Sequence, residues 1–119
     1  MAVVRKRLLT ESEDGKAILV AANATPGTDI HTATGVSVDG SYDEVWLWAQ
    51  NGGPQAVVLC LEWGGTSVPG DVMRFHLPVG GGLIPIVPGF ILHNGKEIAA
   101  FASLPNVVSI IGFVNTITD

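Results

Sequence analysis

The segment 43–63 constrains the fold more than any other part of this chain, because it predicts strands that are apolar on both faces. Residues 44–50 and 55–63 each form an apolar run, and residues 51–54 form a Gly-Pro turn between them, so we predict a β-hairpin. A strand alternates its side chains between two faces, here Val45, Leu47 and Ala49 against Trp46 and Trp48. Since neither face is polar, the second face must be covered by another strand layer, the N-terminal segment or a partner subunit.

The rest of the chain predicts an all-β fold. Fifteen glycines and seven prolines separate short runs rich in Val, Ile, Trp and Phe, and no window shows the apolar spacing of a helix. The predicted strands are 16–22, 29–36, 43–50, 55–63, 71–77, 83–87, 97–103 and 107–117. The prolines of 83–87 place that strand at a sheet edge or beside a bulge. Residues 16–119 are therefore expected to form one antiparallel two-sheet β-sandwich, jelly-roll or Ig-like, of about eight strands.

Residues 1–15 differ from the remainder and predict an N-terminal arm or a peripheral first strand. Their basic and apolar part is a candidate arm for partner contact, and an acidic turn follows it at 11–15. An ordinary frayed terminus is the alternative. The candidate contact residues are Arg5, Lys6, Arg7, Leu8 and Leu9.

The scarcity of charge favours assembly. Charged residues make up 14% of the chain, and between Val45 and Thr118 the sequence has only Glu62, Asp71, Arg74, Lys96 and Glu97. Monomers usually avoid large apolar patches, so part of this surface is expected to be buried in a homo-oligomer. A neutral surface rich in Gly, Thr and Ser is the alternative. The net charge of −5 argues against nucleic acid as a partner.

No residue pattern predicts an enzyme, a metal site or a cofactor. His31, His76 and His93 lie at no ligand spacing, and no serine sits in a nucleophile elbow. Cys60 lies among aliphatic residues and is expected to be a buried hydrophobe. The apolar stretch 83–92 is broken by prolines and is shorter than the ~20 residues of a membrane helix, so no membrane partner is expected.

The three tryptophans leave two interpretations open. Trp46 and Trp48 share one face of their strand, so they are expected to have the same environment, and Trp63 follows at the end of the next strand. Large aromatic residues dominate both cores and subunit interfaces, which favours one of those settings. A sugar-stacking platform is the alternative.

The sequence also resembles small structural proteins of tailed bacteriophages over residues 29–117. The resemblance lies in the order and spacing of DIHTATG at 29–35, DEVWLWA at 43–49, LEWGG at 61–65, LIPIVPG at 83–89, AFA at 100–102 with NVV at 106–108, and GFVN at 112–115. These stretches contain no catalytic motif, so the resemblance implies no set of functional residues.

The resemblance implies a virion structural protein, notably a capsid decoration (cement) protein that binds the outside of the shell as an oligomer, often a trimer. The implied partners are copies of the chain and the major capsid protein or another virion protein. The implied location is the virion, after synthesis in the host cytoplasm. A basic N-terminal arm would face an acidic shell. The alternatives are a tail or head-fibre component, including a receptor-binding module, and a carbohydrate-binding β-sandwich.

Overall fold

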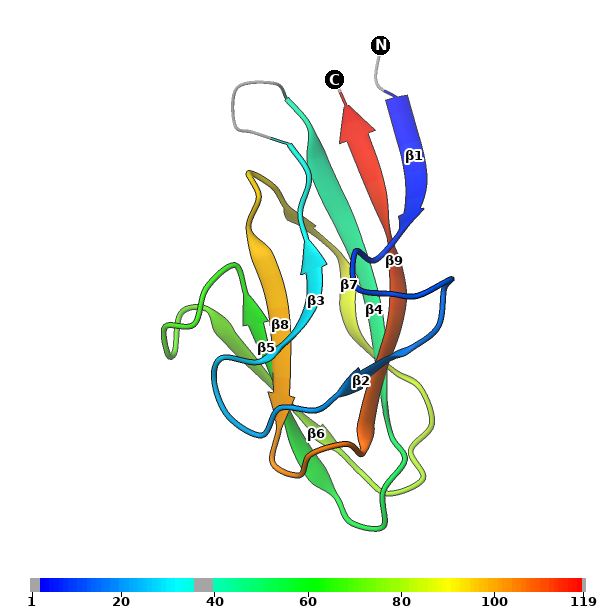
Figure 1. Ribbon diagram of the computed structural model, residues 1–119, viewed down its shortest axis with the longest axis vertical. Helices are drawn as coiled ribbons and strands as arrows, with labels where there is room; N and C mark the ends of the chain where they lie inside the picture. The colour runs from blue at the N-terminus through cyan, green and yellow to red at the C-terminus, as the bar shows by residue number, and fades with distance from the viewer. Residues whose placement is uncertain (1–2, 36–39, 119) are drawn as a thin grey trace.

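The computed structural model describes residues 3–35 and 40–118, and it confirms an all-β, two-sheet antiparallel sandwich (Figure 1). Nine strands lie in these described residues, close to the predicted ranges. They are β1 (Val3–Leu8), β2 (Ile18–Val20), β3 (Thr28–Thr32), β4 (Tyr42–Asn51), β5 (Val57–Trp63), β6 (Val72–Leu77), β7 (Ile84–Leu92), β8 (Glu97–Ala102) and β9 (Val108–Thr118).

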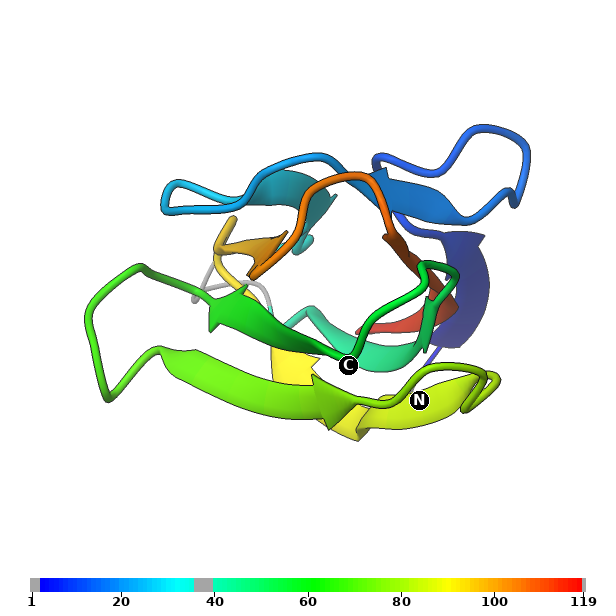
Figure 2. The ribbon, with the colours of Figure 1, turned by 90° about the horizontal axis from the view of Figure 1, so that it is seen from below.

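The strands divide into two sheets that face each other across the core. Sheet A has the order β1-β9-β4-β7, and β2 also pairs with β9, beyond the end of β1. Sheet B has the order β3-β8-β5-β6. Seen along the long axis, the strands surround a central space that the core side chains fill (Figure 2). The long strand β9 carries β1 and β2 on one side and β4 on the other.

The predicted hairpin at 43–63 is wrong, because its two strands lie in different sheets. β4 pairs with β9 and β7, whereas β5 pairs with β6 and β8. The connection between them is an arch that crosses from sheet A to sheet B. The buried Asn51 side chain shapes it, since its Nδ2 donates to the Gln55 carbonyl at 2.6 Å and to the Leu77 carbonyl at 3.2 Å.

The core explains why both strands of this segment are so apolar. Val45, Leu47 and Ala49 of β4 point inward and meet side chains of β5 such as Leu59 and Leu61, all with no exposed surface. Both strands are central in their own sheets, so each has a strand on either side. Burial of apolar surface between the two sheets is the main stabilising term for such a fold.

β7 lies at the edge of sheet A, as its prolines predicted, but it extends to Leu92, beyond the predicted end at 87. The pairing register with β4 shifts beside Pro85 and again beside Pro88. Gly89 follows with a φ of +85°, and a Cβ there would lie 2.8 Å from the Trp46 ring. The strand continues past its second proline because glycine adopts this backbone conformation at no steric cost.

Candidate functional site

The main candidate site is the outer face of sheet A, where an aromatic cluster lies over two central strands. Trp46 and Trp48 of β4 share this face, as their alternation predicted, and both rings stack with Phe113 of β9. The ring centroids are 6.3 and 6.1 Å apart, with interplanar angles of 16° and 29°. The amine of Lys6 on β1 lies 4.6 Å from the Phe113 ring centroid, a cation–π contact.

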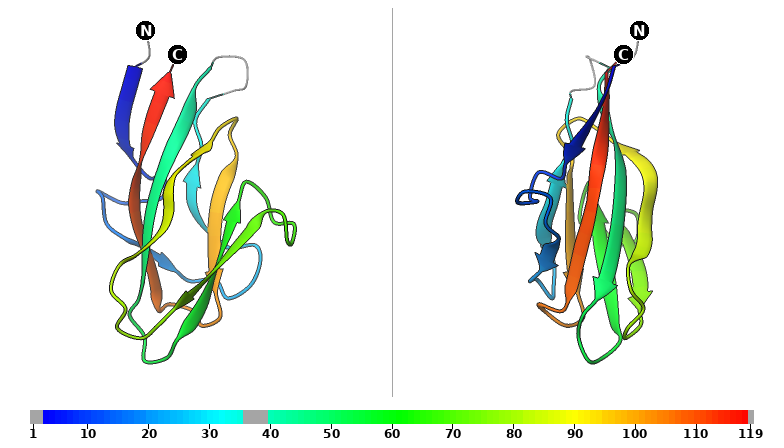
Figure 3. Two further views of the ribbon diagram at one scale, coloured as in Figure 1. Left: turned by 180° about the vertical axis from the view of Figure 1, so that it is seen from behind. Right: turned by 90° about the vertical axis from the view of Figure 1, so that its right-hand side faces the viewer.

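The strand register extends this cluster into rows across the sheet. Residues paired across neighbouring strands share a face, so the cluster row continues from Leu8 on β1 to Pro88 on β7. Figure 3 shows β1, β9, β4 and β7 side by side. The outer face of sheet A is defined by the residues Val4, Lys6, Leu8, Leu19, Tyr42, Glu44, Trp46, Trp48, Gln50, Pro85, Pro88, Ile91, Ser109, Ile111, Phe113, Asn115 and Ile117.

The outer face carries few charges, and they lie in one row. Lys6, Asn115 and Glu44 are neighbours across β1, β9 and β4. The Asn115 Nδ2 and the Trp46 Nε1 donate to one carboxylate oxygen of Glu44, at 3.0 and 2.8 Å. These hydrogen bonds, that of Asn115 first, stabilise the ionised form and lower the pKa of Glu44 below its ordinary value of 4.5. The face therefore presents one cation and one anion held beside an aromatic cluster.

Trp63 lies apart from the other two tryptophans. It sits at the end of β5 on the inner side of sheet B, packs against the core, and meets Phe90 of β7 edge to face, with the rings at 89°. Its position separates it from any platform that Trp46 and Trp48 could form. The three tryptophans therefore have two different environments: Trp63 packs against the core, and Trp46 and Trp48 lie on the outer face of sheet A.

The basic N-terminal segment is an edge strand joined to sheet A. Arg5, Lys6, Arg7 and Leu8 lie in β1, and Leu9 enters the core with 2% of its surface exposed. Arg7 Nη1 donates to Thr116 Oγ1 at 3.0 Å. Removal of residues 1–9 would therefore remove a strand and a core side chain, so it would not test a partner contact cleanly.

A buried polar network, not found from the sequence, connects the segment after β1 with strands of both sheets. Asp43 Oδ2 accepts from His31 Nε2 at 2.7 Å and from the Thr34 N–H at 3.1 Å, and its Oδ1 accepts from Thr116 Oγ1 at 2.8 Å. His31 Nδ1 in turn accepts from the Thr10 N–H at 3.0 Å, which places the ring proton on Nε2. Burial raises the pKa of Asp43, but the hydrogen bonds outweigh it, so the pKa lies below its ordinary value of 3.8.

A shallow cleft of about 300 Å³ lies on the outer side of sheet B, above Ala99. Glu62, buried in its floor, accepts from Thr25 Oγ1 at 2.6 Å and from the Gly27 N–H at 2.7 Å. Both carboxylate oxygens therefore have partners, and the side chain anchors the loop before β3. These two hydrogen bonds account for the burial of the Glu62 carboxylate, and they give it a structural role.

The remaining candidate groups are dispersed. His76 and His93 are exposed, His31 is buried, and within residues 3–35 and 40–118 no three His, Cys, Asp or Glu side chains lie close enough to hold a metal ion. Cys60 is a free, buried thiol, as its sequence context predicted. No helix in the described part of the chain is long and apolar enough to cross a membrane.

Comparison with known proteins returned no match to any family model, curated protein or solved structure. The geometry of the outer face of sheet A is therefore the main basis for a functional proposal.

Proposed function

We propose that this chain is a non-enzymatic structural protein that packs against copies of itself through the outer face of sheet A, and that it decorates a bacteriophage capsid. The observation that carries the assembly role is the composition of that face. Trp46, Trp48 and Phe113 lie at its centre, and Lys6 and Glu44 are its charged residues among those that the structure describes. A broad apolar face of this kind is typical of a protein interface.

The periphery of the face supports the same proposal. Leu19 on β2 and Ile91 on β7 lie at opposite sides of it and expose 52% and 57% of their surface. Such side chains would lose contact with water when a second apolar face covers them, at about 25 cal/mol per Å² of buried area. Aromatic residues at the centre with aliphatic residues around them match the usual arrangement of interface anchors.

The two charges make the face complementary to itself. Lys6 and Glu44 are on β1 and β4, with β9 between them, so their backbones are about 10 Å apart at the usual strand spacing. A symmetric arrangement of copies can bring the Lys6 of one copy to the Glu44 of the next. A closed trimer is the assembly we favour, following the resemblance to phage decoration proteins. The capsid partner and the virion location rest on that resemblance.

The assembly role is tested by the native mass of matched variants, measured by light scattering after size exclusion. The wild type should be an oligomer, and Leu19→Lys with Ile91→Lys should shift it to the monomer mass of 12.4 kDa. Val68→Lys with Val79→Lys adds the same charge at positions that are 65% and 54% exposed outside this face, and should leave the oligomer intact. A monomeric wild type, or equal dissociation of both variants, would refute the role.

The virion location is tested separately by mass spectrometry of purified phage particles that encode this chain. The chain should be present at a fixed ratio to the major capsid protein. Its absence from particles, or its presence only in isolated tails, would overturn the decoration role while leaving the assembly face untouched.

A carbohydrate-binding module is a second candidate, favoured by the nearly parallel stacking of Trp46 on Phe113. Sugar rings stack on exposed aromatic faces, so soluble glycans should quench or shift the tryptophan fluorescence. A screen of neutral and acidic oligosaccharides without any change would remove this candidate. A glycan response that vanishes in Trp48→Ala would instead displace the assembly role.

A further inference from the structure

The free edge of β1 is a second surface that can bind a partner. β1 pairs with β9 along its whole length, and in the part of the chain that the structure describes no strand pairs with its other edge (Figures 1 and 3). An edge strand offers a row of backbone N–H and C=O groups to any extended chain that lies alongside. β1 is six residues long and contains no proline.

Two other edge strands of the sandwich, β7 and β3, are obstructed. β7 carries Pro85 and Pro88, which lack the N–H that a ladder needs. The edge of β3 is covered by the segment after β1, since the Glu11 N–H donates to the Ile30 carbonyl at 3.3 Å and the Thr32 N–H donates to Thr10 Oγ1 at 2.7 Å. β6 has an unpaired edge as well, but it carries a single Arg and a single His.

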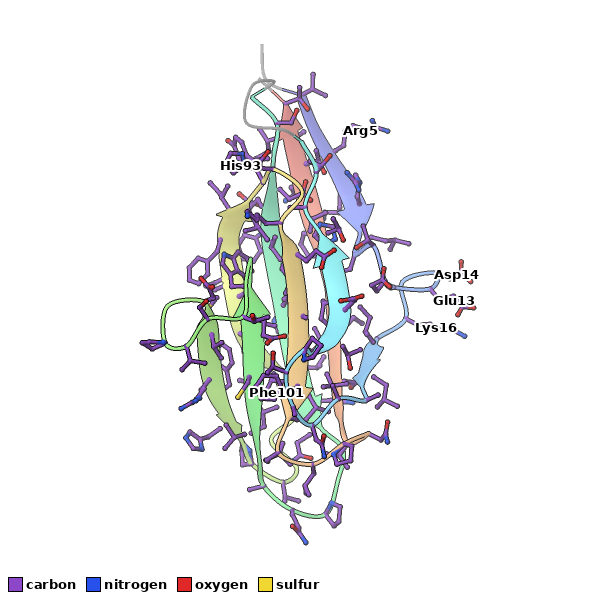
Figure 4. All side chains as sticks on the ribbon, turned by 60° about the vertical axis from the view of Figure 1, so that its left-hand side comes forward. Arg5, Glu13, Asp14, Lys16, His93 and Phe101 are labelled. Carbon is purple, nitrogen blue, oxygen red and sulfur yellow. The ribbon has the colours of Figure 1, made fainter. Side chains whose placement is uncertain are left out.

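Charge distinguishes β1 from these edges. Arg5, Lys6 and Arg7 are three of the six basic residues of a chain with net charge −5. Arg5 and Lys6 are exposed, and Arg5 points away from the sandwich in Figure 4. Two antiparallel copies of β1 would place these cations opposite one another, which disfavours pairing of the chain with itself at this edge.

We propose that the free edge of β1 binds an extended acidic segment of a partner protein by strand addition. Main-chain hydrogen bonds supply the affinity, and carboxylates at the centre of the segment meet Arg5 on one face and Lys6 on the other. Val3, Val4 and Leu8, which are 53%, 61% and 51% exposed, lie on either side of the basic centre. The best partner segment is therefore acidic in the middle and apolar at both ends.

This edge shares Val4, Lys6 and Leu8 with the outer face of sheet A, but strand addition uses the backbone groups of β1 that point away from β9. The inference therefore does not depend on whether the outer face binds a second copy. The partner differs too, because an acidic strand matches the edge and not the aromatic cluster. The double variant Leu19→Lys with Ile91→Lys leaves β1 unchanged, and it should keep the strand addition while losing self-association.

The test is titration of the whole protein with a capped acidic peptide, VTEDETV, followed by NMR shifts and amide exchange. The peptide should shift β1 resonances and protect β1 amides from exchange. The variant Arg5→Glu with Lys6→Glu should bind it at least ~10-fold more weakly, and binding should weaken as salt rises. The matched control, Lys16→Glu with Arg74→Glu, carries the same net charge and should bind as the wild type does.

Two further peptides separate strand addition from simple charge attraction. VEDPETV keeps the length and the three carboxylates but has proline at the centre, and it should bind poorly, because proline cannot donate to the ladder. VTKKKTV reverses the charge and should not bind. Equal binding of the proline peptide, binding of the basic peptide, or protection that maps to β6 and not β1 would overturn the proposal.

Discussion

Replacement of Asp43 tests how the two sheets are held together, because its carboxylate connects strands of both. It accepts hydrogen bonds from His31 on β3, from the Thr34 N–H and from Thr116 on β9, and its side chain is fully buried. Asp43→Ala would leave these three donors without a partner. A buried donor that loses its partner costs about 1–3 kcal/mol, so for three donors we expect a loss of unfolding free energy of at least about 3 kcal/mol.

Asp43→Asn provides the matched comparison. Its amide oxygen can take the position of Oδ2 and accept from His31 and Thr34, while its NH₂ donates to the Thr116 hydroxyl. The His31 tautomer cannot adjust to the opposite amide orientation, because the Thr10 N–H already donates to Nδ1. The structure is thus compatible with one orientation of the amide, and the loss of the charge should cost only about 1–2 kcal/mol.

Urea unfolding at neutral pH, followed by tryptophan fluorescence, measures both variants. A loss of unfolding free energy below about 1 kcal/mol for Asp43→Ala would refute the argument, because buried donors without partners destabilise a fold by more than this. A cost for Asp43→Asn as large as that for Asp43→Ala would show that the amide cannot adopt the expected orientation.

The pH dependence of this pair has a definite sign. The pKa of Asp43 is lower in the folded state than its ordinary value of 3.8, so the ionised carboxylate stabilises the fold above that value. This contribution is lost as the pH falls below about 4 toward the lower folded-state pKa. The stability difference between wild type and Asp43→Asn should therefore shrink from pH 7 to pH 3. A constant or growing difference would contradict this assignment.

Two further substitutions test close packing and loop anchoring. Gly112→Ala should lose at least ~2 kcal/mol in urea unfolding, because its Cβ would overlap the Trp46 carbonyl oxygen, whereas Gly70→Ala, with open space around it, should be near neutral. Equal losses of unfolding free energy in the two variants would show that β4 and β9 can move apart to accommodate the added methyl group. Glu62→Ala should lose about 2–3 kcal/mol and speed proteolysis of the loop that it anchors, while the exposed Glu97→Ala should do neither. Unchanged proteolysis would show that the loop is held by other contacts.

The sequence predicted the positions of the strands well and their pairing poorly. Alternating apolar residues and Gly-Pro turns are local signals, so β4 and β5 were located within a few residues. The same local pattern suits a hairpin and an arch between sheets. The choice depends on β9, which pairs with β4 from more than 50 residues away in the chain.

The candidate site was predictable to the same extent. Alternation along β4 placed Trp46 and Trp48 on one face, and this is how the structure has them. Phe113 could not be assigned to that face without the register between β4 and β9. The link from Asp43 to Thr116 spans 73 positions, and neither residue type predicts burial, so no sequence signal pointed to it.

The pairing of Val3 with Thr118 has a mechanical consequence. Hydrogen bonds between antiparallel strands run across the strand direction, so a force applied between these two residues would load the bonds singly, beginning with the outermost pair. Such a pull would break the hydrogen bonds between β1 and β9 in succession, so each bond would carry the load alone. A tether that pulls on both Val3 and Thr118 would therefore separate β1 from β9 one hydrogen-bonded pair at a time.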